Sequence, residues 1–156
     1  MDMRKCAWLA AAVFVADQAS KAFAVAYFDG ALGIKPLTGF FNFVLTYNRG
    51  ISFSLLSGEG LASRLALTAL AAAIVGGLVI WLRREDDPAA RGGLALLIGG
   101  ALGNIADRVA RGAVVDFLDF YAWGWHWPAF NLADTAICLG AATVLLSGLR
   151  AKKPAK

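Results

Sequence analysis

Four long apolar stretches constrain the fold of this chain more than any other feature of its sequence. They cover residues 6–28, 61–82, 92–110 and 131–149. A helix of about 20 apolar residues is long enough to cross the roughly 30 Å hydrocarbon core of a bilayer. Hydrophobic residues make up 59% of the chain and charged residues 17%, which is more apolar than a soluble domain usually is. We therefore predict an all-α polytopic membrane protein with four transmembrane helices.

Basic residues near the ends of these stretches predict the orientation in the membrane, because cytoplasmic loops are enriched in Lys and Arg. Nine lie on the side of the two termini: Arg4, Lys5, Arg83, Arg84, Arg91, Arg150, Lys152, Lys153 and Lys156. Five lie on the opposite side: Lys35, Arg49, Arg64, Arg108 and Arg111. We therefore predict that both termini are cytoplasmic. Since these residues flank apolar runs, the net charge of +4 favours membrane lipids over nucleic acid as a partner.

Two segments, residues 29–60 and 111–130, then lie outside the cytoplasm, and each is longer than a simple connector needs to be. The first contains FFNFVLTYNRGISFSLL, whose aromatic and β-branched residues around an Asn-Arg-Gly turn signal predict a small β-structure. The second contains VVDFLDFYAWGWHWPAF, and its Trp and Tyr rings suit the headgroup level of a membrane. We expect His126 to lie there too, and we expect residues 1–156 to form a single membrane-embedded domain.

The polar residues in and near the apolar stretches fall at one depth, towards the outer side. Ionisable residues within membrane spans are costly and normally face a partner, a water-filled cavity or the bundle interior. Asp17 and Lys21 are spaced to pair on one helical face. For these two and for Asp107, stabilising ion pairs explain the pattern as well as a functional role does. The residues at this depth are Asp17, Lys21, Asn48, Asn104, Asp107, Arg108, Asp116, Asn131 and Asp134.

Asp116 and Asp134 are the two carboxylates of this set without an evident local cation. Two carboxylates held close together cannot both ionise easily, so they share a proton. One then acts as a base on water while the other polarises a carbonyl, as in aspartic proteases. Asparagines nearby suit the peptide groups of a substrate, and Arg108 suits a lipid phosphate or an inner carboxylate. We expect Asp119 to be a solvated bystander in a wet loop.

Other hydrolytic chemistries fit less well. The chain has one histidine and no G-x-S-x-G motif, so a His-based triad is not expected. A Ser–Lys dyad stays open, from Ser52 or Ser54 with Lys35, or from Ser20 with Lys21. Metal-dependent hydrolysis would need His or Cys ligands beyond those present, so we expect neither a metal nor another cofactor.

Two other classes of protein are open alternatives. A small proton-coupled transporter would use intramembrane Asp and Lys, but it would need polar residues in both halves of the membrane. An assembly subunit would use the G-x-x-x-G face of Gly99 and Gly103, which lets another helix approach closely. It would leave the unpaired aspartates unexplained.

Four motifs of the chain together resemble one known family. DQASK, YNRGISFS, GGALGNIADRVARGAVVDFLDF and FNLADTAI are similar, in order and spacing, to the motif blocks of the lipoprotein signal peptidases, or signal peptidase II family. The resemblance covers nearly the whole chain. It implies an aspartic endopeptidase of the bacterial inner membrane that cuts diacylglyceryl-modified prolipoproteins just before the lipidated cysteine. It also implies a β-structure and a short outer helical loop that hold the substrate, and inhibition by globomycin.

The resemblance also implies roles for individual residues. Asp116 and Asp134 match the catalytic aspartates of the family. The family's supporting, substrate-binding positions fall on Asp17, Lys21, Asn48, Gly50, Asn104, Asp107, Arg108 and Asn131. One departure is in the outer loop, where the family often has Ala-Ala-Phe and this chain has Ile51, Ser52 and Phe53.

Overall fold

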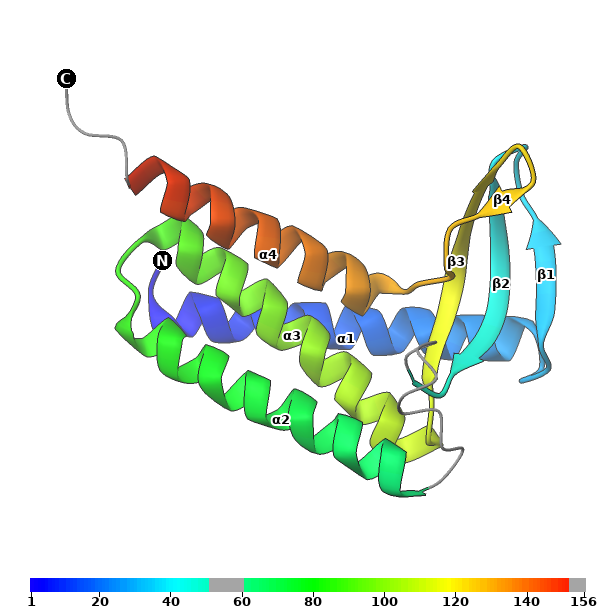
Figure 1. Cartoon of the computed structure of the whole chain (residues 1–156), viewed down its shortest axis with the longest axis horizontal. Helices are drawn as coiled ribbons and strands as arrows, with labels where there is room; N and C mark the ends of the chain where they lie inside the picture. Colours follow the sequence, from blue (N-terminus) through cyan, green and yellow to red (C-terminus); the bar gives the residue numbers. More distant parts are fainter. Residues whose placement is uncertain (51–60, 152–156) are drawn as a thin grey trace.

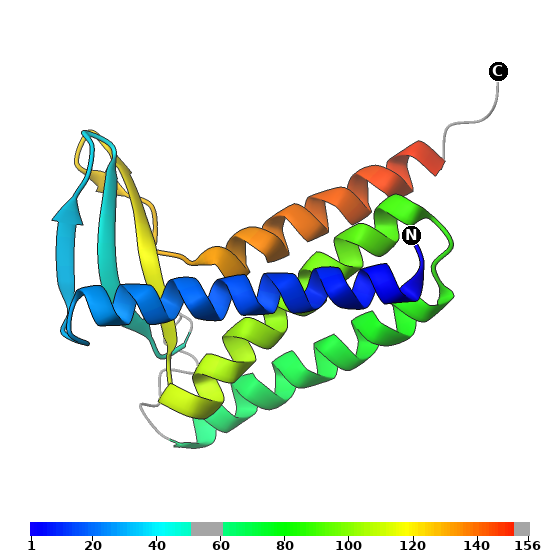
Figure 2. The same ribbon diagram turned by 180° about the vertical axis from the view of Figure 1, so that it is seen from behind.

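The structure, a computed structural model, describes residues 1–50 and 61–151. Within these ranges the chain forms four long helices, each long and apolar enough to cross a membrane. The start of the first helix and the end of the last lie at the same end of the bundle (Figures 1 and 2). The predicted fold class is therefore confirmed. The helices are α1 (Met3–Tyr27), α2 (Leu61–Arg84), α3 (Pro88–Arg111) and α4 (Leu132–Ala151).

Capping residues explain where the central helix α3 begins and ends. It starts at Pro88 rather than at residue 92, because the carboxylate of Asp87 accepts a hydrogen bond from Ala90 N at 2.9 Å. Proline at the start of a helix costs no hydrogen bond, since that amide has no partner within the helix. The helix ends at Gly112, which adopts the left-handed conformation with φ 77°. Asp87 therefore has a structural role at the start of α3.

Glycines on α3 allow its neighbours to approach closely. A Cβ added at Gly99 would lie 2.6 Å from the carbonyl oxygen of Ala10 on α1. A Cβ added at Gly100 would lie 2.5 Å from the carbonyl oxygen of Ala133 on α4. The predicted packing face of Gly99 and Gly103 is thus occupied by α1 of the same chain. This packing makes α3 the central helix of the bundle.

Replacing Gly99 by alanine is expected to destabilise the protein by about 1–3 kcal/mol, because the methyl group meets backbone that cannot move aside. The matched control is Gly76→Ala on α2, where an added Cβ meets nothing within 4 Å. That change should be neutral or stabilising by up to about 1 kcal/mol, because alanine favours helix. Thermal unfolding of both variants in detergent measures the difference. Equal stability of the two variants would contradict the packing described.

The two outer segments form one four-stranded antiparallel sheet. Its strands are β1 (Gly33–Pro36), β2 (Phe41–Asn48), β3 (Val114–Ala122) and β4 (Trp125–His126), in the spatial order β1-β2-β3-β4. The predicted β-structure in the first segment is confirmed. The second segment also forms strands, because its alternating residues pair with β2. The short outer helical loop that the resemblance implies is not present in residues 29–50 or 112–130, which form strands and turns, and residues 51–60 lie outside the described part of the chain.

The sheet packs against the outer end of α1, which passes along it (Figure 2). Ala24 of α1 forms a buried cluster with Leu45 of β2 and with Val115 and Phe117 of β3. These apolar contacts hold β3 across the end of the bundle. Asp116, which lies between Val115 and Phe117, points to the other side of the strand.

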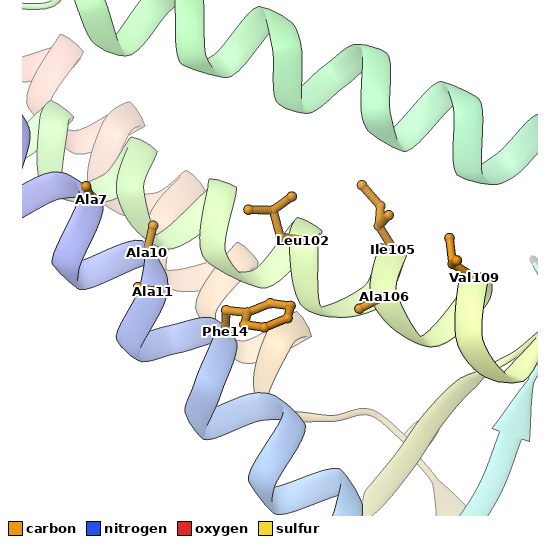
Figure 3. Close-up of a pocket in the computed structure, with 8 residues that line it drawn as sticks. All are labelled: Ala7, Ala10, Ala11, Phe14, Leu102, Ile105, Ala106 and Val109. Carbon is orange, nitrogen blue, oxygen red and sulfur yellow. The ribbon is translucent and has the colours of Figure 1, made fainter.

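A separate apolar groove of about 710 Å³ runs between α1 and α3 (Figure 3). Its walls include Ala7 and Phe14 of α1 and Leu102, Ile105 and Val109 of α3. All of these side chains are apolar and lie within candidate membrane spans. The groove therefore offers no polar group for chemistry, and the polar site lies elsewhere.

Candidate active site

The predicted site residues lie on α1, on the second half of α3, on β2 and β3, and at the start of α4. Asp116 lies on β3 with 2% of its surface exposed. Asp134 lies in the first turn of α4. Asn131, directly before that helix, is fully buried. The two carboxylates that the sequence singles out are thus placed on neighbouring elements.

Asn131 connects the two carboxylates. Its Nδ2 atom donates a hydrogen bond of 2.6 Å to Asp116 Oδ1. Its backbone N donates to Asp134 Oδ2 at 3.3 Å, and its Oδ1 accepts from the backbone N of Asp134 at 2.9 Å. This reciprocal pair is a capping box, in which the side chains of the N-cap residue and of the third helical residue each accept a hydrogen bond from the other's backbone N–H. The sequence Asn-Leu-Ala-Asp therefore starts α4 and orients Asp134 at once.

Asn104 of α3 contacts Asp134 from the other side. Its Nδ2 donates to Asp134 Oδ1 at 2.8 Å. Its Oδ1 accepts from Lys21 Nζ at 2.9 Å. Because an ammonium can only donate, the contact with Lys21 fixes the Asn104 amide so that its NH₂ group faces Asp134.

Lys21 is the centre of a fully buried ion network. Its Nζ lies 2.9 Å from Asp17 Oδ2 and 2.9 Å from Asp107 Oδ2, and all three side chains are 0% exposed. The predicted pairing of Asp17 with Lys21 is confirmed. Asp107 pairs with Lys21 and with Arg111, and not with its neighbour Arg108. Two buried carboxylates are thus balanced by the buried Lys21 and by the partly exposed Arg111.

The same network reaches the backbone beside each candidate catalytic residue. The second oxygen of Asp17 accepts a hydrogen bond of 2.9 Å from the backbone N of Ala133, next to Asp134. Asp107 Oδ2 accepts from the backbone N of Val115 at 3.2 Å, next to Asp116. The network therefore ties the start of α4 to α1 and the start of β3 to α3.

The remaining predicted residues lie at the edge of the site. Asn48 ends β2 and accepts a hydrogen bond of 3.1 Å from the backbone N of Gly50, whose φ of 149° favours glycine. Arg108 NH1 donates to Asn104 O at 3.4 Å. Within the described residues, Arg108 Nε is a buried donor without a hydrogen-bond partner. This guanidinium therefore retains donor capacity beside the two aspartates.

Comparison with known proteins identifies the family of this chain. The family model described as Signal peptidase (SPase) II matches residues 9–150. The chain belongs to the signal peptidase II family. Its members are aspartic peptidases, so the predicted enzyme class is confirmed and replaces the transport and assembly alternatives.

Similar proteins support this assignment over most of the chain. The lipoprotein signal peptidase of Aeromonas hydrophila is 49% identical over 148 residues, which are 94% of this chain and 89% of that protein. That of Vibrio cholerae is 46% identical over 153 residues, 95% of this chain and 88% of the relative. A solved bacterial membrane enzyme, determined by the in meso method at 2.3 Å, superposes with a TM-score of 0.80. The two sequences are 26% identical, and the match covers 99% of this chain and 94% of the solved chain.

Burial, together with the negative charge of Asp134, raises the pKa of Asp116 in this signal peptidase II to about 6. Hydrogen bonds from Asn48 and Asn131 and the positive charge of Lys21 oppose this rise in pKa. Asp134 accepts two hydrogen bonds, from Asn104 Nδ2 and from the backbone N of Asn131, which suit an ionised carboxylate. The environment of Asp116 therefore favours its protonated form more than water does, and the donors around Asp134 fix the position of its carboxylate.

The raised pKa of Asp116 makes a prediction about stability. The folded state holds this proton more tightly than the unfolded chain, where the pKa is ordinary at 3.8. Wild type therefore loses stability as pH rises through about 6, and Asp116→Asn, which cannot ionise, does not. At pH above about 7 the variant should be more stable than wild type by about 1–3 kcal/mol, a gain that disappears near pH 4. Unfolding in detergent at both pH values tests this, and a pH-independent difference would contradict it.

The prediction for Asp119 is wrong, because this carboxylate is 6% exposed and not solvated. It lies on β3 opposite Asn42 of β2, whose Nδ2 donates to it at 2.7 Å. His126, predicted to be interfacial, is half-exposed and lies 2.9 Å from Asp119 Oδ2. Asp119 is buried because the pairing of β2 with β3 brings it face to face with Asn42, which is distant in the sequence.

The proposed Ser–Lys dyads receive no support from the described residues. Ser20 Oγ donates to the backbone oxygen of Asp17 at 2.8 Å, and Lys21 is surrounded by its ion partners. Ser52 and Ser54 lie outside the described residues, as do Ile51 and Phe53.

Proposed function

We propose that this signal peptidase II removes the signal peptide from diacylglyceryl-modified prolipoproteins, cutting just before the lipidated cysteine, with Asp116 and Asp134 as its catalytic dyad. The observation that carries the proposal is that Asn131 hydrogen-bonds both carboxylates. The names of the relatives, lipoprotein signal peptidases, support the substrate class. The matching motif blocks support the two catalytic positions.

The reaction follows from the different environments of the two carboxylates. Ionised Asp134 accepts a proton from a water molecule, whose oxygen attacks the carbonyl carbon of the scissile peptide bond. Protonated Asp116 donates a hydrogen bond, and then its proton, to the carbonyl oxygen as charge develops there. When the C–N bond breaks, the leaving nitrogen takes up a proton from the dyad. The low exposure of Asp116 to water helps this carboxylate to hold its proton.

The proposed orientation places this chemistry at the outer face of the inner membrane. The excess of basic residues beside the termini supports cytoplasmic termini. The sheet and the dyad lie at the opposite end of the bundle, where a signal helix would leave the hydrocarbon (Figure 1). Residues 1–156 act as one domain with membrane lipids around it, and globomycin-type inhibitors occupy the dyad. Arg108, Asn48 and Gly50 contact the substrate at the edge of the site.

Cleavage by the purified protein tests this function. The substrates are a prolipoprotein with a diacylglyceryl-modified cysteine and the same protein without the modification. We expect cleavage of the first only, with the lipidated cysteine as the new N-terminus, and inhibition by globomycin. Equal cleavage of both substrates, or cleavage at another bond, would contradict the proposed substrate class.

A further inference from the structure

The segment that joins the two candidate catalytic residues folds back along β3. After Asp116 the chain follows β3, turns at Trp123 and Gly124, and returns through β4 to Asn131 (Figure 1). At the far end of this return, Tyr121 pairs with His126 and Trp127 N donates to Phe120 O at 2.8 Å. At the near end, Phe130 N donates to Leu118 O at 3.0 Å, and Leu118 N donates back at 2.9 Å. Asn131 directly follows this last pair.

One buried carboxylate joins three strands within this region. Asp119 of β3 accepts a hydrogen bond of 2.7 Å from Asn42 Nδ2 of β2. Its two oxygens lie 3.0 and 2.9 Å from Nδ1 of His126 on β4. A carboxylate taken out of water costs several kcal/mol unless donors surround it. Asp119 therefore depends on Asn42 and His126 for its burial, and it fixes the positions of both side chains in return.

The His126 ring is also fixed by its neighbours. It stacks on Tyr121 at a centroid distance of 5.0 Å with an interplanar angle of 15°. The ring is half-exposed, so no apolar core holds it, and its position depends on these two contacts. Strand β4 has two residues, and strands this short have few backbone bonds of their own. The contact with Asp119 thus adds a side-chain link to the few backbone bonds that hold β4 against β3.

The position of β4 bears on the dyad through Asn131. The return segment from His126 to Phe130 is short, and at its end Asn131 hydrogen-bonds Asp116 at 2.6 Å and Asp134 at 3.3 Å. A displacement of the segment along β3 would move both of these donors. A shift of about 1 Å in catalytic groups is enough to cost about a hundredfold in rate.

We propose that Asp119 and His126 are positioning residues for the peptidase reaction, because together they hold the return segment that places Asn131 between the two carboxylates. The proposal rests on the proposed function, in which Asp116 and Asp134 are the catalytic dyad. Asp119 and His126 touch neither the substrate nor the reacting atoms in this account. Their effect is therefore on kcat rather than on KM.

The test compares kcat and KM for Asp119→Ala, His126→Ala and the double variant, with a diacylglyceryl-modified prolipoprotein as substrate. Each single variant should lower kcat at least about tenfold and change KM less than about twofold. The double variant should be no slower than the slower single variant, because either change opens the same contact. If the two residues had a purely structural role, the variants would unfold at a lower temperature, but their effects on kcat would not show this non-additivity.

Two control variants sharpen the result. His126→Asn keeps an N–H donor at the position of Nδ1, so it should restore kcat to within about threefold of wild type. Trp123→Asn alters the same hairpin at a fully exposed side chain and keeps a residue that tolerates its φ of 51°, so kcat should not change. Unchanged kcat in His126→Ala, additive losses in the double variant, or a rise in KM alone would overturn the proposal.

The same experiment separates this proposal from the proposed function. Wild type and Asp116→Asn are measured in parallel. If wild type does not cut the lipidated substrate, or Asp116→Asn cuts it normally, the dyad itself is wrong and the positioning role falls with it. If both behave as proposed while the three Asp119 and His126 variants keep wild-type kcat, only the positioning role is wrong.

Discussion

Asparagine at position 116 or 134 is expected to lower kcat for prolipoprotein cleavage by about a thousandfold or more. A carboxamide of nearly the same shape can neither accept the proton of water nor donate one to the substrate, and general acid–base catalysis contributes about 10²–10⁴ in rate. The hydrogen bond that Asn131 makes to Asp116 is 2.6 Å long, so the site holds the amide in the same place. Single-turnover cleavage by each purified variant, with unfolding temperatures measured alongside, gives the result.

The control for these variants is Asp86→Asn. This carboxylate is fully exposed in the loop between α2 and α3 and lies 3.9 Å from Arg91 NH2, an exposed pair that contributes little. Its replacement should leave kcat unchanged. Asp119→Asn is not a suitable control, because that carboxylate is buried and paired. A folded Asp116 or Asp134 variant that cuts within about tenfold of wild type would remove that residue from the mechanism.

The second large effect is expected from Lys21→Met. Removing this cation leaves the buried Asp17 carboxylate without its charge partner, and breaking a buried ion pair on one side costs about 3–5 kcal/mol. It also removes the donor that orients the Asn104 amide towards Asp134. We therefore expect a clear loss of unfolding free energy and a fall in kcat of about tenfold or more. Unfolding in detergent and steady-state kinetics measure the two effects separately.

A double variant distinguishes the two roles of Lys21. In Lys21→Met with Asp17→Asn, the uncompensated charge is gone while the asparagine still offers an oxygen to Ala133 N. Arg111 continues to balance Asp107. The double variant should recover most of the lost stability but not the lost kcat, since Asn104 Oδ1 then keeps only the longer contact of 3.4 Å from Asn131 Nδ2. Recovery of both, or wild-type behaviour of the single variant, would show that Lys21 has no positioning role.

Local patterns in the sequence were sufficient to predict the helices and the depth of the site. Span length and hydropathy identify the four helices, because a bilayer accepts few other structures. The capping box of Asn131 and Asp134 is also a local signal, readable from Asn-Leu-Ala-Asp. The i, i+4 spacing predicts the contact of Asp17 with Lys21. Each of these features depends on residues close together in the chain.

Features that depend on distant residues could not be predicted in the same way. The register of β2 on β3 places Asn42 opposite Asp119, 77 residues away, and a bulge between Phe43 and Thr46 helps to set it. Nothing in the neighbourhood of Asp119 indicates this partner. Similarly, Asp107 has the adjacent Arg108 and the more distant Lys21 as candidate partners, and only the packing of α1 on α3 selects Lys21.

The claim that the dyad activates water directly is tested by cleavage in H₂¹⁸O. One turnover of wild-type protein on a diacylglyceryl-modified prolipoprotein is followed by mass spectrometry of the released signal peptide and of the peptides that contain Asp116 and Asp134. Direct attack by water predicts one ¹⁸O atom in the new C-terminal carboxylate of the signal peptide and none in either aspartate. Label in Asp116 or Asp134, with an unlabelled signal peptide, would instead show that an aspartate attacks the substrate and forms a covalent intermediate.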